Sequence, residues 1–159
     1  DCVARLLAEP GIEVNQANKG GATPLLMACQ NGCVHSAKLL LADERVRVNQ
    51  ATRDDATSNY NTSNQWVAGG IPMQNLTPLY VAVQEGHLEV VRGLVEQDGI
   101  DLDKPGNTDN RPEIGFQSPL QVARELGYDA IVEVLLAAGA KDDKAAPATA
   151  SDTAAAAAE

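Results

Sequence analysis

Aromatic side chains are scarce in this chain of 159 residues: they make up 3% of it, with one tryptophan and one phenylalanine. A core with so few rings must be built from leucine, valine, isoleucine and alanine. This composition argues against a β-sandwich or an aromatic-lined cofactor barrel, and it suits a solenoid of small helices. The length suits a single domain.

Long apolar runs and positive charge are also missing. No run approaches the roughly 18 residues that a membrane-spanning helix needs, so we expect no membrane insertion. The chain has 12 Lys and Arg residues and 22 Asp and Glu residues, which give a net charge of -10. This balance disfavours nucleic acid as a partner. It favours a protein partner with a basic surface, although a merely solvated acidic surface explains the same charge.

Residues that could carry chemistry are few, with two histidines and three cysteines. Cys29 and Cys33 have no matching His or Cys pair elsewhere, so we expect buried free thiols rather than a zinc site. Free thiols indicate a reducing compartment. The chain contains no nucleophile elbow, phosphate loop or paired Cys-x-x-Cys. We therefore expect no enzyme and no small-molecule substrate, and we assign no catalytic, cofactor-binding or metal-ligating residue.

What the chain does contain is a repeated tripeptide. Thr-Pro-Leu stands at 23–25 and 77–79, and Ser-Pro-Leu follows at 118–120. An alanine comes five residues after each Thr or Ser, a glycine nine residues after it, and an aliphatic pair 17 and 18 residues after it. These places are filled by Ala28, Ala82 and Ala123; by Gly32, Gly86 and Gly127; and by Leu40-Leu41, Leu94-Val95 and Leu135-Leu136. Recurrence in register indicates a solenoid, whose usual role is binding.

Each recurring residue has a structural role in the repeat. A Thr or Ser hydroxyl caps free N–H groups at a helix start, and proline suits the first helical position because it lacks a donor there. The small alanine lets another helix approach closely. Glycine adopts the left-handed conformation that ends one helix and allows the chain to reverse. Helix-period apolar residues then predict a second helix, and an extended turn follows.

Helix, tight turn, helix and extended turn together resemble the ankyrin repeat. Gly21-Ala-Thr-Pro-Leu25, Gly86-His87 and Val14-Asn15 match the family pattern directly. The resemblance covers roughly residues 1–143. It implies an all-α solenoid of stacked helix-turn-helix units with projecting β-turns or hairpins. It also implies that the His87 ring bonds locally between repeats, and we expect Tyr80 and Tyr128 to be packing residues.

The organisation that we expect follows from the repeat register. Residue 1 is Asp, and residues 3–7 correspond to the second helix of a repeat whose first helix is absent. We therefore expect a processed product, a fragment, or the ordered part of something longer. The expected parts are a partial repeat (1–17), a repeat (18–51), an insert (52–76), a repeat (77–103), an insert (104–117), a C-terminal repeat (118–143) and an Ala-rich disordered tail or linker (144–159).

The spacing of the repeats is irregular. Thr23 and Thr77 lie 54 residues apart, and Thr77 and Ser118 lie 41 apart, where the family period is about 33. The excess falls in two extended turns, which should be near neighbours on one edge of the stack. The inserts hold or adjoin most of the scarce aromatic residues. Their candidate partner-binding residues are Tyr60, Trp66, Ile71, Met73 and Phe116.

Two interpretations of the inserts stay open. Aromatic side chains on a projecting edge suit an interface anchor, whereas Trp66 could instead fold back and cover the apolar flank of the stack. The resemblance implies further binding positions, because family members hold ligands with turn tips and the exposed face of each first helix. Those positions are Lys19, Gly20, Ala22, Gln30, Asn31, Gln84, Glu85 and Glu125.

These observations predict a non-catalytic protein-protein interaction module that binds through its concave face and its enlarged turns. Two alternatives stay open. The chain could be a structural subunit of a large multiprotein assembly, with a neighbour replacing the absent helix. It could equally be the regulatory ankyrin region of a larger enzyme, channel or ligase. We expect a cytoplasmic protein, although an organelle stays open because a targeting peptide would be lost from view.

Overall fold

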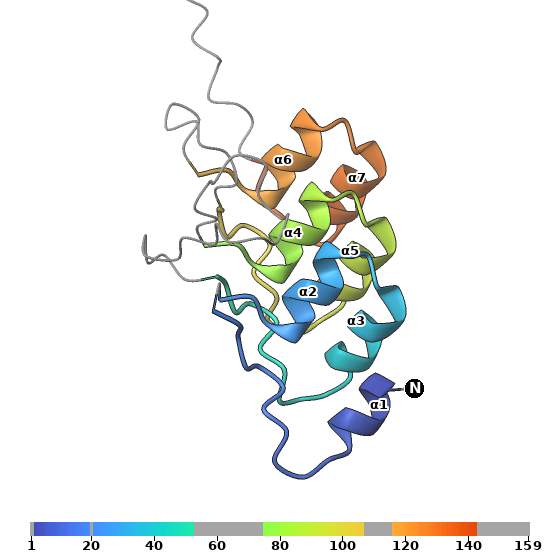
Figure 1. Ribbon diagram of the computed structural model, residues 1–159. Coiled ribbons are helices and arrows are strands. Elements are labelled where there is room, and N and C mark those ends of the chain that lie inside the picture. Colours follow the sequence, from blue (N-terminus) through green and yellow to red (C-terminus); the bar gives the residue numbers. More distant parts are fainter. Residues whose placement is uncertain (1, 20, 53–74, 107–115, 143–159) are drawn as a thin grey trace, which may run out of the picture.

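The computed structural model describes residues 2–19, 21–52, 75–106 and 116–142. Within these ranges the chain forms seven short helices and no strand. Helices α2, α4 and α6 pack in one layer and α3, α5 and α7 in a second layer, which α1 extends beside α3 (Figure 1). This confirms the expected all-α solenoid. The helices are α1 (Cys2–Leu7), α2 (Pro24–Gln30), α3 (Val34–Leu41), α4 (Pro78–Gln84), α5 (Leu88–Val95), α6 (Pro119–Glu125) and α7 (Asp129–Ala137).

The start of each first-layer helix is capped as the sequence predicts. The hydroxyl oxygens of Thr23, Thr77 and Ser118 accept backbone N–H groups at 3.2, 3.1 and 3.3 Å. Each cap precedes a proline at the first helical position. Such caps stabilise a helix by about 1 kcal/mol, which matters for helices of only seven residues.

A glycine ends each first-layer helix, and in two repeats an aromatic ring covers it. Gly32, Gly86 and Gly127 have φ angles of 62, 74 and 72°, in the left-handed region. A Cβ atom on Gly32 would lie 2.7 Å from the His87 ring, and one on Gly86 would lie 2.9 Å from the Tyr128 ring. The Nε2 atom of His87 also lies 3.1 Å from the carbonyl oxygen of Gln30. These contacts confirm that His87 bonds between repeats and that Tyr128 is a packing residue.

The core lies between the two helix layers and contains the recurring alanines and leucines. Leu40, Leu94 and Leu135 are 5, 0 and 0% exposed. Helix α4, in the middle of the first layer, is buried almost throughout, including the Tyr80 ring at 1% exposure. This confirms the packing role expected for Tyr80.

Equivalent polar residues in the extended turns join one repeat to the next. The side chain of Asn15 donates to the carbonyl of Arg45 at 2.6 Å and accepts the N–H of Arg47 at 2.7 Å. One side-chain amide thus satisfies both a donor and an acceptor of the following turn. The corresponding bonds in later repeats run from Asn49 to Gly99 and Asp101, and from Asp103 to Lys141.

The two cysteines expected to be buried differ in exposure. Cys29 is fully buried, and burial raises the pKa of its thiol to about 12. Cys33 is exposed, so the expectation that it is buried was wrong. It stands where His87 and Tyr128 stand in later repeats, and each of those rings covers the glycine of the preceding hairpin. In the described ranges no such hairpin precedes Cys33, so its side chain stays open to solvent.

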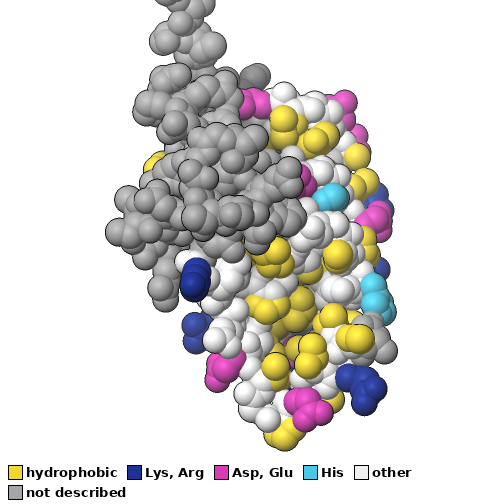
Figure 2. Space-filling view, viewed as in Figure 1, with side chains coloured by type: hydrophobic (Ala, Val, Ile, Leu, Met, Phe, Trp, Pro, Cys, Tyr) yellow, Lys and Arg dark blue, Asp and Glu magenta, His cyan; other side chains and the backbone are white. Residues whose placement is uncertain are grey.

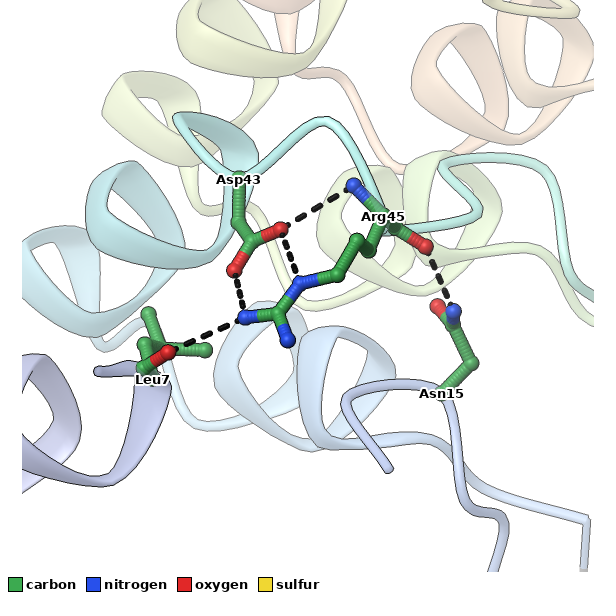
Figure 3. Close-up of polar contacts among 4 residues, drawn as sticks. All are labelled: Leu7, Asn15, Asp43 and Arg45. Atoms are coloured by element: carbon green, nitrogen blue, oxygen red, sulfur yellow. Dashed lines mark hydrogen bonds and ion pairs between the residues drawn. The ribbon is translucent and has the colours of Figure 1, made fainter. Parts of the chain in front are cut away.

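Helix α1 is fastened to the following repeat by Arg45 (Figure 3). The guanidinium donates to the carbonyl of Leu7, in the last turn of α1, at 3.0 Å. The carboxylate of Asp43 holds that guanidinium in place by accepting its Nε at 2.9 Å and its terminal nitrogen at 2.6 Å. Asn15 donates to the carbonyl of the same arginine. Arg45 therefore satisfies an orphan carbonyl at a helix C-terminus and joins two repeats.

The Asp43–Arg45 pair predicts a specific acid titration. Hydrogen bonds from the Arg45 side chain and backbone lower the pKa of Asp43 from 3.8 to about 2. A depressed pKa stabilises the fold above about pH 4, and that stabilisation is lost as the pH falls from about 4 to 2. NMR titration of the carboxyl carbon should therefore show a midpoint near 2, and Arg45→Ala should return it towards 3.8. An unchanged midpoint in Arg45→Ala would contradict the contact.

Candidate interaction surface

Both inserts leave and rejoin the stack through closed necks. At the long insert, Thr52 donates its N–H to the carbonyl of Leu76, and Leu76 returns its N–H to the Thr52 hydroxyl, both at 3.0 Å. At the short insert, Gly106 and Gln117 exchange backbone hydrogen bonds of 3.0 and 3.1 Å, forming an isolated antiparallel bridge. Each neck holds together the two ends of its insert, so the repeats on either side are joined independently of the residues between.

The two necks are also joined to each other. The side chain of Asn75 donates to the carbonyl of Pro105 at 2.9 Å. A Cβ atom on Gly106 would lie 2.8 Å from Leu76 and 3.1 Å from the Tyr80 ring, so a larger residue would require these buried side chains to shift. The two necks therefore lie next to each other, whereas most of each insert lies outside the described residues, so the expected proximity of the inserts themselves stays a prediction. The described parts of the extended turns lie together on one side of the stack (Figure 1).

Asn75 and Gly106 are functional candidates that the sequence did not single out. Asn75 has a φ of 58°, the one positive φ of a non-glycine residue among those described. Asparagine tolerates this conformation better than most residues. Pro105-Gly106 is a turn signal, yet nothing in the sequence shows that Leu76 and Tyr80 press against the glycine. Together the two residues set how closely the insert necks approach.

Phe116 lies at the base of the short insert and is 52% exposed. The adjacent Gln117 is held by the backbone bridge, and its side chain donates to the carboxylate of Glu125 at 2.6 Å. The aromatic ring is therefore presented to solvent beside a fixed point of the backbone. Fixed backbone next to an exposed ring is typical of an interface anchor, because little ordering is needed on binding.

The remaining candidates fall into three groups. Gln30, Gln84 and Glu125 form a row at the C-terminal ends of α2, α4 and α6, with the two glutamines half-buried and the glutamate exposed. Asn31 and Glu85 follow that row and are exposed, although Asn31 donates to the carbonyl of its own helix at Met27. Lys19 is exposed in a turn, and Ala22, just after that turn, is half-buried and donates its N–H to the side-chain oxygen of Asn18 at 3.0 Å. The others, outside the described residues, are Gly20, Tyr60, Trp66, Ile71 and Met73.

The described residues also bear on two other kinds of site. These ranges contain no group of three or more His, Cys, Asp or Glu side chains placed to hold a metal ion. Among the helices they form, none is long and apolar enough to cross a membrane. The acidic side chains of Glu89, Glu96 and Glu133 are exposed on the second helix layer, as expected for solvated faces.

Comparison with known proteins supports the repeat assignment. A family model described as ankyrin repeats (3 copies) matches residues 1–106 and 58–146. The chain is also 30% identical over 148 residues to Rabankyrin-5 from Homo sapiens, and equally so to Rabankyrin-5 from Mus musculus. These matches cover 88% of this chain and 12% of each relative, so the chain spans a small part of the length of the curated relatives it matches.

Proposed function

The chain belongs to the ankyrin repeat family, and on that premise we propose that it is a non-catalytic module that binds a protein partner through its insert edge. The insert edge is the surface around Asn75, Pro105, Gly106 and Phe116, together with the two inserts that start and end there. Ankyrin repeats are generally protein-protein interaction modules, and the finer assignment concerns where the partner sits.

The observation that carries the proposal is the pair of closed, adjacent necks. An insert that only filled a gap would need neither hydrogen bonds between its own two ends nor a hydrogen bond to the neck of the other insert. The bond from Asn75 to Pro105 and the close contact at Gly106 instead hold the ends of the two inserts at one place. The exposed Phe116 ring stands beside them. Burying such a ring against a partner is worth about 1.5–3 kcal/mol.

Charge supports a partner with a basic surface. The chain carries a net charge of -10, which would speed the approach of a positively charged protein and weaken the complex as salt is added. The row formed by Gln30, Gln84 and Glu125, which follows the first helix layer, extends the proposed contact from the insert edge along the stack.

Substitution of single exposed side chains tests this function. Because it removes the proposed anchor, Phe116→Ala should lower capture of the partner by about tenfold or more, the effect of one good hot-spot residue. Trp66→Ala should do the same if the long insert contributes. Affinity capture from source cells with quantitative mass spectrometry measures the loss, and circular dichroism checks the fold.

Leu126→Ala is the matched control. Leu126 is 48% exposed, close to the 52% of Phe116, and it lies directly after α6. Loss of exposed apolar area alone would affect both variants equally. Selective loss with Phe116→Ala supports the insert edge. Unchanged capture with both Phe116→Ala and Trp66→Ala would place the partner elsewhere and refute the proposal.

A further inference from the structure

The extended turns carry a charged residue at the same place in four successive units of the stack. The first two of these turns read Ile-Glu-Val-Asn-Gln-Ala (12–17) and Val-Arg-Val-Asn-Gln-Ala (46–51), so the glutamate and the arginine correspond. The residues at this place, which we call the charge row, are Glu13, Arg47, Asp101 and Lys141. All four are exposed, and the sign of the charge alternates along the stack. Figure 2 shows basic and acidic side chains gathered over the extended turns at the lower left of the molecule.

Equivalent hydrogen bonds fix the backbone of the charge row. The N–H groups of Arg47, Asp101 and Lys141 each donate to a polar side chain of the preceding turn, at 2.7, 2.9 and 2.8 Å. The carbonyls of Glu13 and Arg47 each accept the N–H of the residue three places later, at 3.0 and 3.2 Å, so these two residues begin the same kind of turn. The four side chains therefore leave the backbone from equivalent points, one in each turn.

The members of the charge row do not neutralise one another. The helices that precede these turns pack side by side, and packed helices lie about 8–10 Å apart, so we expect the row to recur at about that spacing. Such a spacing is comparable to the Debye length of about 8 Å at physiological salt. Among the described residues no ion pair joins two members of the row, and Lys141 instead approaches the carboxylate of Asp103 at 3.8 Å. The alternating charges of Glu13, Arg47 and Asp101 are therefore open to a ligand.

A polar cleft of about 370 Å³ lies between the first two members of the charge row. Its lining residues are Glu13, Asn15, Gln16, Arg47 and Gln50. The side chain of Gln50 donates to the carbonyl of Asn15 at 3.4 Å, whereas its Oε1 atom is shielded from solvent and has no hydrogen-bond partner among the described residues. A buried acceptor without a donor costs free energy. The cleft thus combines a carboxylate, a guanidinium and an acceptor that an N–H group of a bound polypeptide would satisfy.

We propose that the charge row binds an extended segment of a partner protein in the polyproline II conformation, with a basic, an acidic and a basic residue at every third position. The basic residues lie against Glu13 and Asp101, and the acidic residue lies against Arg47. Polyproline II has three residues per turn and rises about 3.1 Å per residue, so side chains on one face recur about every 9 Å, as the turns do. Side chains on one face of a β-strand recur about every 7 Å and would not stay in step. This inference does not rest on the insert edge or on its partner.

Two synthetic peptides of one composition test the proposal. Lys-Pro-Pro-Glu-Pro-Pro-Lys places its three charges on one face of polyproline II, whereas Lys-Pro-Glu-Pro-Lys-Pro-Pro places them on three different faces. An exposed ion pair contributes about 1.4-fold to 5-fold in affinity, and the second peptide loses two of them. We therefore expect it to bind about fivefold more weakly. NMR titration at low salt, followed by the amide shifts of Glu13, Arg47 and Asp101, measures both dissociation constants.

Charge reversal in the protein provides the matched control. Arg47→Glu should weaken binding of the first peptide by about fivefold or more, and replacing the peptide's glutamate with lysine should restore it. Lys38→Glu makes the same charge change at an exposed residue of α3 and should have neither effect. Phe116→Ala should leave peptide binding unchanged, because it alters the insert edge alone. Equal binding of the two peptides, equal losses in Arg47→Glu and Lys38→Glu, or no binding of either peptide would overturn the proposal.

Discussion

Leu94→Ala should lower the free energy of unfolding by about 2–5 kcal/mol, a large share of the stability of a domain this size. Leu94 is fully buried in α5, whose helix packs against α3, α4 and α7. Removing three carbon atoms there loses their transfer free energy and leaves a cavity that three fixed neighbours cannot close. Urea denaturation followed by circular dichroism measures the loss.

Leu6→Ala is the matched control, because Leu6 occupies the same place in its repeat at 56% exposure. The substitution is chemically identical, so propensity and unfolded-state effects largely cancel between the two variants. We expect Leu6→Ala to cost under about 1 kcal/mol. Similar costs at both positions would show that the repeat register is wrong or that Leu6 is covered in solution.

The repeat positions could be predicted from the sequence because they depend on local rules. The cap at Thr23, the reversal at Gly32 and the buried place of Leu40 each follow from helix starts, glycine conformation and helix period. The same pattern occurring three times in register makes each assignment support the others. Short-range order of this kind specifies a solenoid, because every repeat contacts only its neighbours.

Contacts between residues far apart in the chain could not be predicted in the same way. The bond from Arg45 to Leu7 spans 38 residues, and the bond from Asn75 to Pro105 spans 30. No propensity or spacing rule selects these partners, since they meet only after the repeats stack. The prediction that Cys33 is buried was wrong for a related reason. In later repeats the residue at this place contacts the glycine of the preceding hairpin, and no such hairpin precedes Cys33 in the described ranges.

The candidate site was predicted in outline. Irregular spacing predicts that the extra chain leaves the stack in two turns, and the described necks at Thr52–Leu76 and Gly106–Gln117 lie close to those places. The sequence placed the start of the short insert at 104, whereas the neck closes at Gly106. A two-residue shift of this kind follows from the bridge to Gln117 and the contact with Leu76, neither of which leaves a local signal.

Gly32→Ala should be the most damaging of the glycine substitutions, costing about 2–4 kcal/mol. The left-handed φ of 62° alone penalises an L-residue by about 1–2 kcal/mol. In addition, the new Cβ atom would lie 2.7 Å from the His87 ring, which must then shift. That shift weakens the contact of its Nε2 atom with the carbonyl of Gln30, a loss of about 0.5–1.5 kcal/mol. Urea denaturation again provides the measurement.

Gly127→Ala separates the conformational penalty from the clash with the ring. The φ of Gly127, 72°, is similar to that of Gly32, and nothing lies within 4 Å of the added Cβ atom. It should cost only the conformational penalty, while the gain from a stiffer unfolded chain is common to both variants. In a His87→Ala background, Gly32→Ala should then cost no more than Gly127→Ala. A persistent excess would mean that strain in the turn, rather than the ring that covers it, explains the loss. Removal of the excess would identify the His87–Gly32 contact as a source of coupling between adjacent repeats.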